Sequence, residues 1–239
     1  MTVANQRVVL LGGTSGLGFA VAELLAAQGA ELVLASSSQA RVDEAVAKLP
    51  GGTTGYAVDL RSEEAIARLF ETIGEFDHLV YTAGEALSLL PVDGMDLDVA
   101  REFFGLRFFS VLTAVKHAAK RIRPGGSITL TTGSAGERPS PGWSVAASIC
   151  GAISSLTKAL AVELAPIRVN AVAPGVVRSP MWASLGAEAR EAYFTQVSDA
   201  TLVKRVGETE QVAQTYAYLI DQPFSSGTVV AVDGGTLLV

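Results

Sequence analysis

The sequence predicts a single α/β domain in which a doubly wound parallel β-sheet carries helices on both faces. Two observations support this fold class. Short β-branched or apolar runs alternate with longer helical patterns along the 239 residues. The short runs are apolar at consecutive positions, which is typical of strands that are covered on both sides. A chain of this length can bury the core of one large domain.

The expected strands begin close to the N-terminus and recur along the whole chain. They are Arg7–Leu11, Glu31–Ala35, Thr54–Val58, His78–Tyr81, Ser127–Thr131, Arg168–Val172 and Val229–Val232. The expected helices are Leu17–Gln28, Arg41–Lys48, Glu63–Ile73, Asp98–Arg123, Ser144–Leu164 and Glu210–Leu219. Ser62 precedes the third helix, where its hydroxyl can cap the first turn. The alternation predicts right-handed crossovers between parallel strands.

Residues 179–207 form the one irregular region, with a short helix expected at Glu188–Val197. Ligands of doubly wound sheets bind beyond the carboxyl ends of the strands. Because this region follows the sixth strand, we expect it to be a lid over a ligand site, inserted in a single domain that spans residues 1–239.

The composition argues against several classes of function. The net charge of −6 provides no electrostatic footprint for nucleic acid or for anionic membranes. We expect neither a signal peptide nor an apolar stretch long enough to span a bilayer. Cys150 is the only cysteine, so an intrachain disulfide is impossible and a cytoplasmic location is expected. No metal site is expected.

A glycine-rich loop joins the first strand to the first helix. It reads Gly12-Gly13-Thr14-Ser15-Gly16-Leu17-Gly18. Glycine permits a tight turn and lets backbone N–H groups approach a phosphate, while the helix presents its positive N-terminal end to the charge. A strand, a glycine cluster and a helix in this order predict a dinucleotide-binding loop of Rossmann type. The alternative is an ordinary turn between a strand and a helix.

Five segments in the same order resemble the short-chain dehydrogenase/reductase family over nearly the whole chain. They are the glycine loop, with Leu11 in place of the usual threonine, Ala57–Leu60, Tyr81–Gly84, Leu160–Gly175 and Val232–Gly235. Tyr81–Gly84 keeps only the second half of the family's Asn-Asn-Ala-Gly, and Ser179 stands where a threonine is common. The resemblance implies a Rossmann-type fold that binds NAD(H) or NADP(H) and acts on a carbonyl or an alcohol.

The resemblance also implies which residues hold the cofactor. The pyrophosphate is expected over the glycine loop and the adenine beside Asp59, which could instead be a solvated acid at the end of a strand. The implied cofactor-binding residues are Gly12, Thr14, Ser15, Gly16, Leu17, Gly18, Ser37, Ser38, Arg41, Asp59, Leu60, Ala83, Gly84, Pro174, Gly175, Val177 and Ser179.

The end of the second strand favours NADP(H) over NAD(H). NAD-binding chains commonly place an acid there for the ribose 2′-hydroxyl. This chain has no acid there but has Ser36, Ser37 and Ser38 followed by Arg41, whose hydroxyls and charge can accept a 2′-phosphate. NAD(H) stays possible, and the serines could instead only turn the chain and cap the next helix.

The residues that carry the family's chemistry are replaced. The resemblance implies a tyrosine that transfers a proton, a lysine that lowers its pKa and holds the ribose, a serine that orients the substrate and an asparagine that supports a water chain. An ungapped alignment puts Ala146, Cys150, Gly133 and Arg107 at these positions, and no Tyr-x-x-x-Lys occurs in the chain. Alanine cannot transfer a proton, and a neutral thiol cannot supply the charge of lysine.

Four nearby residues are candidates for part of this chemistry. Ser134 or Thr132 can take the serine role after a shift of one residue, Arg107 carries a fixed charge, and Tyr81 ends the fourth strand beside the cofactor loop. Each also has a structural interpretation, since Tyr81 can pack in the core and Arg107 can form an ion pair.

Four other residues have simpler interpretations. Trp143 and Tyr193 could also substitute for the missing catalytic groups, or they could form apolar walls of a pocket. His78 and His117 are expected on the surfaces of the fourth strand and of a helix.

Two functions fit these observations. The first is an NADP(H)-dependent oxidoreductase that acts on a small carbonyl or alcohol through an atypical active site. The second is a catalytically inactive protein that binds the dinucleotide as a sensor or as the partner of an active subunit. The resemblance implies a homodimer or homotetramer built on the two long helices, with apolar contacts expected from Phe104, Phe108, Val111, Ile153 and Leu160.

Overall fold

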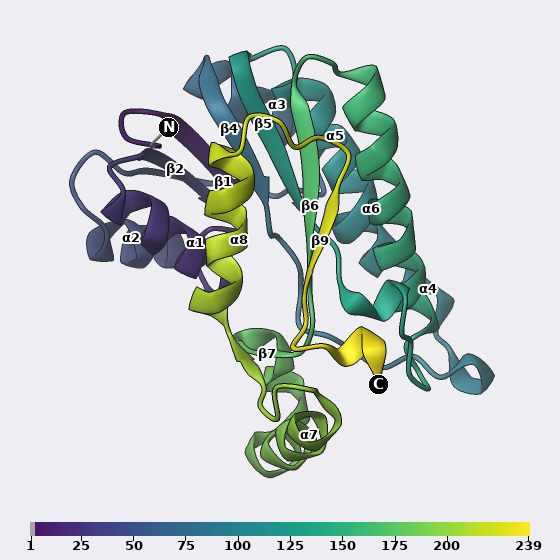
Figure 1. The fold of residues 1–239 in the computed structure, drawn as a ribbon. Coiled ribbons are helices and arrows are strands. Elements are labelled where there is room, and N and C mark those ends of the chain that lie inside the picture. The colour runs from purple at the N-terminus through teal and green to yellow at the C-terminus, as the bar shows by residue number, and fades with distance from the viewer. Residues whose placement is uncertain (1–2) are drawn as a thin grey trace.

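The computed structural model describes residues 3–239 and has the predicted doubly wound α/β fold (Figure 1). Its main sheet contains seven strands, which are β1 (Arg7–Leu11), β2 (Glu31–Ser36), β3 (Thr54–Ala57), β4 (Phe76–Tyr81), β5 (Ile122–Thr131), β6 (Arg168–Pro174) and β9 (Val229–Val232). All are parallel, in the order β3-β2-β1-β4-β5-β6-β9. The order reverses between β1 and β4, so a ligand site is expected beyond the carboxyl ends of these two strands.

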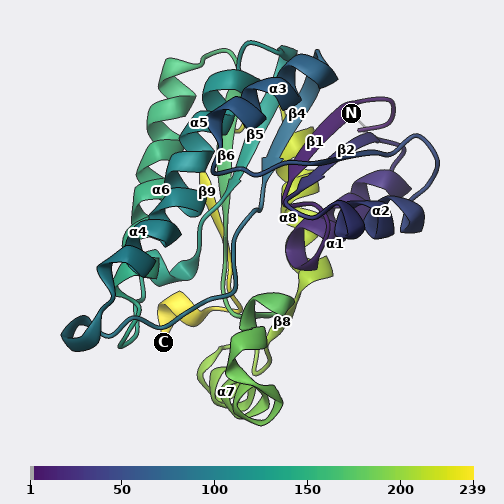
Figure 2. The same ribbon diagram turned by 180° about the vertical axis from the view of Figure 1, so that it is seen from behind.

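Helices cover both faces of the sheet (Figures 1 and 2). They are α1 (Gly16–Ala27), α2 (Gln39–Lys48), α3 (Glu63–Ile73), α4 (Leu97–Phe104), α5 (Ser110–Ala118), α6 (Ser144–Glu163) and α8 (Thr209–Asp221). Helices α1, α2 and α8 contribute to the core on one face, and α3, α4, α5 and α6 to the core on the other. Ser62 caps α3 as predicted, because its hydroxyl accepts a hydrogen bond from the Ala65 N–H at 3.2 Å.

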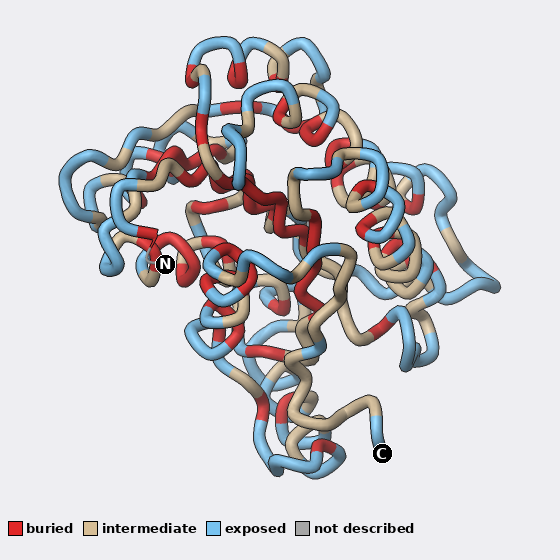
Figure 3. Tube along the Cα trace, turned by 45° about the horizontal axis from the view of Figure 1, so that its top comes forward, coloured by how far each residue is buried: buried red, intermediate tan, exposed pale blue. Residues whose placement is uncertain are grey.

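The central strands β1 and β4 are buried along most of their length, and red segments run through the middle of Figure 3. In β1, Val8 and Leu10 face the α1 and α8 side, while Val9 and Leu11 face the α3 side. All four side chains are fully buried. This two-sided burial explains why the strands are apolar at consecutive positions.

The prediction of one helix over Asp98–Arg123 is wrong. Helix α4 ends at Phe104, a π-turn covers Gly105–Phe109, and α5 ends at Ala118. Both the backbone N–H and the hydroxyl of Ser110 donate to the carbonyl of Gly105, the hydroxyl at 3.0 Å. A bond that spans five residues widens the helix locally, and such turns are frequent at functional sites.

A small lobe, residues 177–208, lies beyond the carboxyl ends of the strands, at the bottom of Figures 1 and 2. It contains β7 (Val177–Arg178), the 3₁₀ helix η4 (Pro180–Leu185), α7 (Ala187–Ala200) and β8 (Gly207–Glu208). Arg178 ties α7 to β7, since its Nη1 donates to both carboxylate oxygens of Glu191 at 3.0 Å. The guanidinium of Arg178 also lies 4.6 Å from the ring centroid of Phe194.

Helix α6 corrects the expectation that no apolar stretch is long enough to span a bilayer. Its 20 residues are sufficient by length and composition, with a mean hydropathy of 1.6. The helix packs along β6, and Val145, Ile149 and Ile153 are buried in the core. A core helix of a globular domain satisfies the same criterion, so this property alone does not indicate a membrane span.

The apolar residues expected to form a contact between subunits divide into two groups. Val111, Ile153 and Leu160 are buried within the chain's own core, so they cannot form such a contact. Phe104 and Phe108 are only partly buried. The large apolar side chains that are exposed on these helices are Leu97, Phe109 and Val162.

His78 lies in the core, which corrects its expected place on a strand surface. It is 2% exposed, with Nδ1 2.8 Å from the Ser127 hydroxyl and Nε2 2.9 Å from the side-chain oxygen of Gln6. Burial lowers the pKa of His78 to about 4, and the positive charge of Arg168 contributes to this shift. His117 is half-buried and lies 3.1 Å from the carboxylate of Glu63.

Candidate functional site

The glycine loop is packed too closely for most side chains. A Cβ on Gly12 would lie 2.5 Å from the backbone nitrogen of Ala83, and one on Gly18 would lie 2.2 Å from the carbonyl oxygen of Gly12. The loop therefore lies directly on the segment that follows β4, and α1 lies directly on the loop. This packing brings Gly12, Gly18, Ala83 and Gly84 together at the carboxyl edge of the sheet.

Gly16 is less tightly enclosed than Gly12 and Gly18. It begins α1 with φ +50°, and the nearest neighbours of a Cβ there would be the side chains of Pro180, at a tight 3.2 Å, and Ser179, at 3.8 Å. Ser15 precedes the helix, and the first turn of α1 contains no acidic residue. The loop thus offers free backbone N–H groups at a positive helix end and fits the pyrophosphate of a dinucleotide.

Ser37 and Arg41 lie side by side after β2, at the position predicted to distinguish the two dinucleotides. The Arg41 guanidinium donates to the Ser37 hydroxyl at 3.4 Å, and both side chains are exposed. Ser38 caps α2, because its hydroxyl accepts a hydrogen bond from the Arg41 N–H at 3.4 Å. The capping role expected as an alternative is therefore present for Ser38, while Ser37 and Arg41 stay available to a phosphate.

At the end of β3, Asp59 is exposed and Leu60 is not. One Asp59 carboxylate oxygen accepts a hydrogen bond from the Arg61 N–H at 2.9 Å. The other oxygen can face an adenine. Leu60 is 5% exposed and belongs to the core, so only its backbone can contact a cofactor.

Most of the remaining predicted cofactor residues lie at the end of β6 or just after it. Pro174 ends β6. The next residue, Gly175, packs closely against Asp233, because a Cβ on Gly175 would lie 2.7 Å from the Cα of Asp233. The side chain of Val177 is buried, and its carbonyl accepts a hydrogen bond from the indole N–H of Trp182 at 3.0 Å. Val177 can therefore face a cofactor only through its backbone, whereas Ser179 lies opposite Gly16. Thr14 and Leu17 are partly exposed in the glycine loop.

Gly133 and Cys150, the residues that the alignment places at the serine and lysine positions, are adjacent in the structure. A Cβ on Gly133 would lie 3.1 Å from the Sγ of Cys150. Burial raises the pKa of the Cys150 thiol, against smaller opposing effects from Thr132, Arg107 and a Gly136 backbone hydrogen bond. The Cys150 thiol is therefore neutral, and Ala146 lies one turn earlier on the same helix.

Of the two candidate hydroxyls, Thr132 serves the fold. Its hydroxyl donates to the carbonyl of Cys150 at 2.7 Å and lies 3.3 Å from the hydroxyl of Ser154. Ser134 begins a short 3₁₀ helix, Ser134–Gly136, and is half-buried. Within residues 3–239, no hydrogen bond occupies its hydroxyl, so Ser134 is the better candidate for the serine role.

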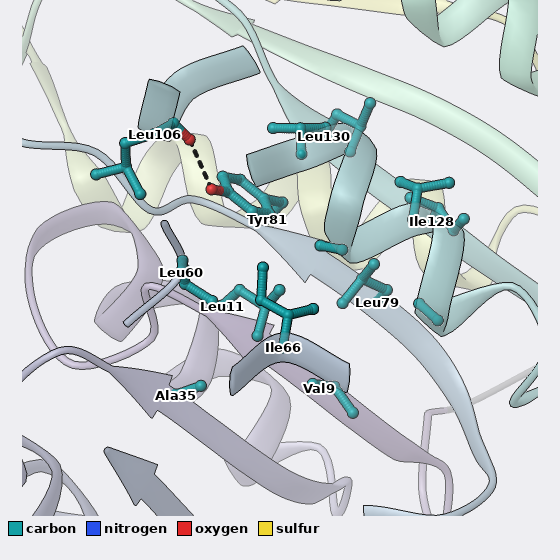
Figure 4. Close-up of a cluster of buried hydrophobic side chains, with 14 of the residues drawn as sticks. Val9, Leu11, Ala35, Leu60, Ile66, Leu79, Tyr81, Leu106, Ile128 and Leu130 are labelled. Carbon is teal, nitrogen blue, oxygen red and sulfur yellow. Dashed lines mark hydrogen bonds between the residues drawn. The ribbon is translucent and has the colours of Figure 1, made fainter. Parts of the chain in front are cut away.

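Tyr81 has a packing role rather than an exposed position beside the cofactor loop. Its hydroxyl donates to the carbonyl of Leu106 at 2.7 Å, within the cluster of apolar side chains shown in Figure 4. The side chain is 3% exposed, and burial raises the pKa of Tyr81 far above its ordinary value. A phenol held in this way cannot exchange a proton with a substrate.

Arg107 lies in the π-turn, beside Gly84 and Glu85. Its Nε donates to the Glu85 carboxylate at 3.0 Å, and its Nη2 donates to the Glu85 carbonyl. A Cβ on Gly84 would lie 2.7 Å from the Arg107 Cζ, so the guanidinium lies against the segment after β4. Arg61 also approaches Glu85, at 3.5 Å. The expected ion pair of Arg107 is thus present, and its charge also acts on Cys150.

The structure contains an apolar cavity of about 400 Å³. The sequence predicted two of its walls but not the cavity as a whole. Its lining residues are Leu87, Ser88, Leu89, Trp143, Trp182, Ser184, Leu185, Ala189 and Tyr193. Trp143 and Tyr193 are pocket walls, as one interpretation of the sequence proposed. Trp182 was missed, although its place just after the nicotinamide-side segment was a usable signal.

The fold and the loop geometry define a Rossmann protein with a dinucleotide cradle. The whole chain, residues 1–239, matches the model of the SDR-like Rossmann domain family. The chain belongs to the short-chain dehydrogenase/reductase family, a family of oxidoreductases that bind NAD(H) or NADP(H).

Individual relatives support this assignment. The short-chain dehydrogenase/reductase ucsE of an Acremonium species is 34% identical, over 98% of this chain and 96% of that relative. A solved small-chain dehydrogenase in complex with NADPH has a TM-score of 0.85 and 33% identity, over 98% of this chain and 100% of its own. The MalC reductase/Diels-Alderase from Malbranchea aurantiaca has a TM-score of 0.92 and 28% identity, over 99% of this chain and 98% of its own.

Proposed function

We propose that this protein is an NADP(H)-dependent oxidoreductase that acts on a carbonyl or an alcohol through an atypical active site. One observation carries the proposal. The segment Ser179–Trp182 lies against Gly16 of the dinucleotide cradle at its start and lines the apolar cavity at its end. A cofactor would therefore contact the start of this short segment and a substrate would contact its end, which would place the two molecules next to each other.

The preference for NADP(H) rests on Ser37 and Arg41. Their side chains lie together and exposed after β2, where a guanidinium and a hydroxyl can hold a 2′-phosphate. The relative solved with NADPH is consistent with this choice. NAD(H) is the alternative, and we expect it to bind more weakly.

The cofactor would supply hydride, and the protein would supply positioning and charge. Arg107 is the positive group near the lost lysine position, so it can stabilise negative charge on the substrate oxygen. Ser134 can orient that oxygen through its free hydroxyl. Because Ala146 offers no proton, water provides the proton that completes the alcohol. Loss of general acid catalysis costs about 100- to 10,000-fold in rate.

The test is a turnover assay of the purified protein with NADPH and NADH on a panel of ketones and aldehydes, beside a binding titration. We expect NADPH to bind more tightly than NADH and turnover at least about 100-fold below the ordinary ~10 per second. Restoring ordinary rates should require both Ala146→Tyr and Cys150→Lys, because an unassisted phenol keeps a pKa near 10. Ordinary rates in the unmodified protein would show that another acid exists.

A binding protein is the second candidate, and it is favoured by Ala146, which has no proton to transfer, and by Cys150, which is neutral. In that case NADPH binds but no carbonyl is reduced.

The cavity also suits a reaction that needs no proton donor. MalC is named as a reductase/Diels-Alderase, and a cycloaddition of apolar substrates needs positioning rather than acid–base groups. Product analysis without any cofactor oxidation would distinguish this reaction from reduction.

A further inference from the structure

We propose that the cavity selects an uncharged, flat aromatic substrate of the fused-ring class, rather than a small aliphatic carbonyl. This inference rests on the proposed function, because it assigns the substrate class of the same site. It follows from the walls of the cavity, from its polar groups and from its position beside Ala146.

Three aromatic rings form one continuous wall. Trp182 is 4% exposed and lies at the centre, with Trp143 at 6.4 Å and Tyr193 at 5.0 Å between ring centroids. The interplanar angles are 35° and 45°, so neither neighbour stacks fully on Trp182. Both outer rings also line the cavity, which leaves aromatic surface for a planar ligand. Aromatic pairs at such distances are favourable beyond their buried area.

The polar groups of the cavity are few and uncharged. Two of them are already engaged, since the Trp182 N–H donates to the Val177 carbonyl and the Ser184 hydroxyl donates to the Leu87 carbonyl at 2.9 Å. Among residues 3–239, nothing forms a hydrogen bond with the hydroxyls of Ser88 and Tyr193 or with the indole N–H of Trp143, so these groups can serve a ligand. No charged residue of this described part of the chain lines the cavity. Arg178, the guanidinium packed on Phe194, is paired with Glu191. A charged substrate would therefore lose its hydration without gaining a counter-charge.

The size and the position of the cavity agree with this class. A volume of about 400 Å³ lies within the range of sites that bury a drug-sized ligand, whereas a small aliphatic ketone would leave most of it empty. Trp143 is the residue that precedes α6, and Ala146 follows it by three residues, about 4.5 Å along the helix axis. A carbonyl carried at the edge of a fused ring would thus lie near the residue that the alignment places at the tyrosine position.

The experiment uses the protein's own fluorescence, because its two tryptophans, Trp143 and Trp182, both line the cavity. The cofactor-free protein is titrated with 2-acetylnaphthalene, with 2-naphthoate as the charged analogue and with cyclohexyl methyl ketone as the aliphatic one. We expect saturable quenching by 2-acetylnaphthalene and binding of the other two that is at least about tenfold weaker.

The variants assign the binding to the cavity. Trp143→Ala should weaken 2-acetylnaphthalene binding about tenfold, with Trp182 as the reporter, while Trp143→Phe keeps a ring and most of the affinity. Phe224→Ala is the matched control, since Phe224 is 99% exposed and lies outside the cavity. Equal binding of all three ligands, or unchanged affinity in a folded Trp143→Ala variant, overturns the inference.

Failure of this inference is distinguishable from failure of the proposed function. Turnover of small aliphatic ketones with NADPH, without binding of 2-acetylnaphthalene, overturns the substrate class and leaves the oxidoreductase. Binding of 2-acetylnaphthalene without oxidation of NADPH on any substrate supports the cavity's selectivity and overturns the oxidoreductase.

Discussion

Arg107 is the residue whose charge the proposed chemistry requires. The Arg107 guanidinium donates hydrogen bonds to the side-chain carboxylate and to the backbone carbonyl of Glu85. The positive charge of Arg107 also acts on the Cys150 thiol. We expect Arg107→Met to lower kcat by about 100-fold, because removal of one group that stabilises a developing oxyanion costs this much. Arg107→Lys should recover part of the rate, as measured with NADPH at saturating substrate.

A structural role for the Arg107–Glu85 ion pair would give a different pattern. Glu85→Gln removes the ion pair but keeps the shape of the side chain and leaves the positive charge in the site. If Arg107 acts only by holding the segment after β4, Glu85→Gln and Arg107→Met should lower kcat equally. We expect Glu85→Gln to keep most of the rate.

Thr129 carries a buried hydroxyl without a hydrogen-bond partner among the described residues. It is fully buried in β5, at the centre of the sheet. Replacing it with isosteric valine removes an unsatisfied polar group, so Thr129→Val should raise the free energy of unfolding by about 1 kcal/mol. Thr131→Val is the control and should be destabilising, because that hydroxyl contacts both the Tyr81 carbonyl and the Tyr216 hydroxyl. Urea unfolding measures both changes.

His78 makes stability depend on pH. Its folded pKa is about 4 and its ordinary value is 6.5, so the unfolded chain binds the proton more readily. The stability from neutral His78 is therefore complete above about pH 6.5 and is lost as pH falls toward 4. Between pH 7 and pH 5 this amounts to about 2 kcal/mol, since a tenfold change in proton affinity is worth about 1.4 kcal/mol.

Comparison with His78→Gln isolates this effect, because glutamine does not titrate in this range. Asp77 and Arg168 are the charged groups that act on His78, and both stay in place in the variant. Urea unfolding at the two pH values should show a smaller loss in the variant. An equal loss in both proteins would place the pH dependence on other groups.

At the scale of elements, Gly16 tests the cofactor cradle. Gly16→Val should abolish NADPH binding, because the side chain would fill the narrow space between the loop and Pro180. The residue also has φ +50°, so part of the effect is backbone strain. Gly74→Val is the matched control, since Gly74 has φ +67° with nothing within 4 Å of a Cβ and lies at the end of α3. NADPH titration should be unchanged in that variant.

The elements that the sequence predicted are those whose signal is local. β1, β9 and α3 have the predicted bounds, because apolar runs and a serine cap define them within a few residues. The π-turn at Gly105–Phe109 was not predictable in this way, since a bond from Ser110 to Gly105 leaves the apolar pattern of a helix nearly unchanged.

The candidate site shows the same division. The cradle lies on one strand–loop–helix unit, so its glycines are recognisable in the sequence. The aromatic cavity combines residues 87–89, Trp143 and residues 182–193, which only the fold brings together. Tyr81 was predicted at the site because its strand ends there, but its side chain points into the core.

At the scale of the whole molecule, we expect a dimer or a tetramer. Leu97 and Phe109 are 58% and 59% exposed and line a second hollow of about 300 Å³ on the α4 face, an unfavourable surface for a monomer. Phe109→Glu should shift the protein to a smaller species in sedimentation velocity. Val92→Glu, at a 77% exposed position outside this hollow, should leave the sedimentation coefficient unchanged. A monomer in the unmodified protein at micromolar concentration contradicts the expectation.

The close packing of the glycine loop bears on how such chains diverge. Gly12, Gly13 and Gly18 have no room for a Cβ, because backbone or buried side-chain atoms lie within 3 Å of it. Selection for folding alone would therefore retain them in a lineage that had stopped using a dinucleotide. Ser37 and Arg41 are exposed and free of that constraint, so they would drift first. In descendants of this chain, the identity of these two positions reports cofactor use, whereas the glycine loop reports ancestry.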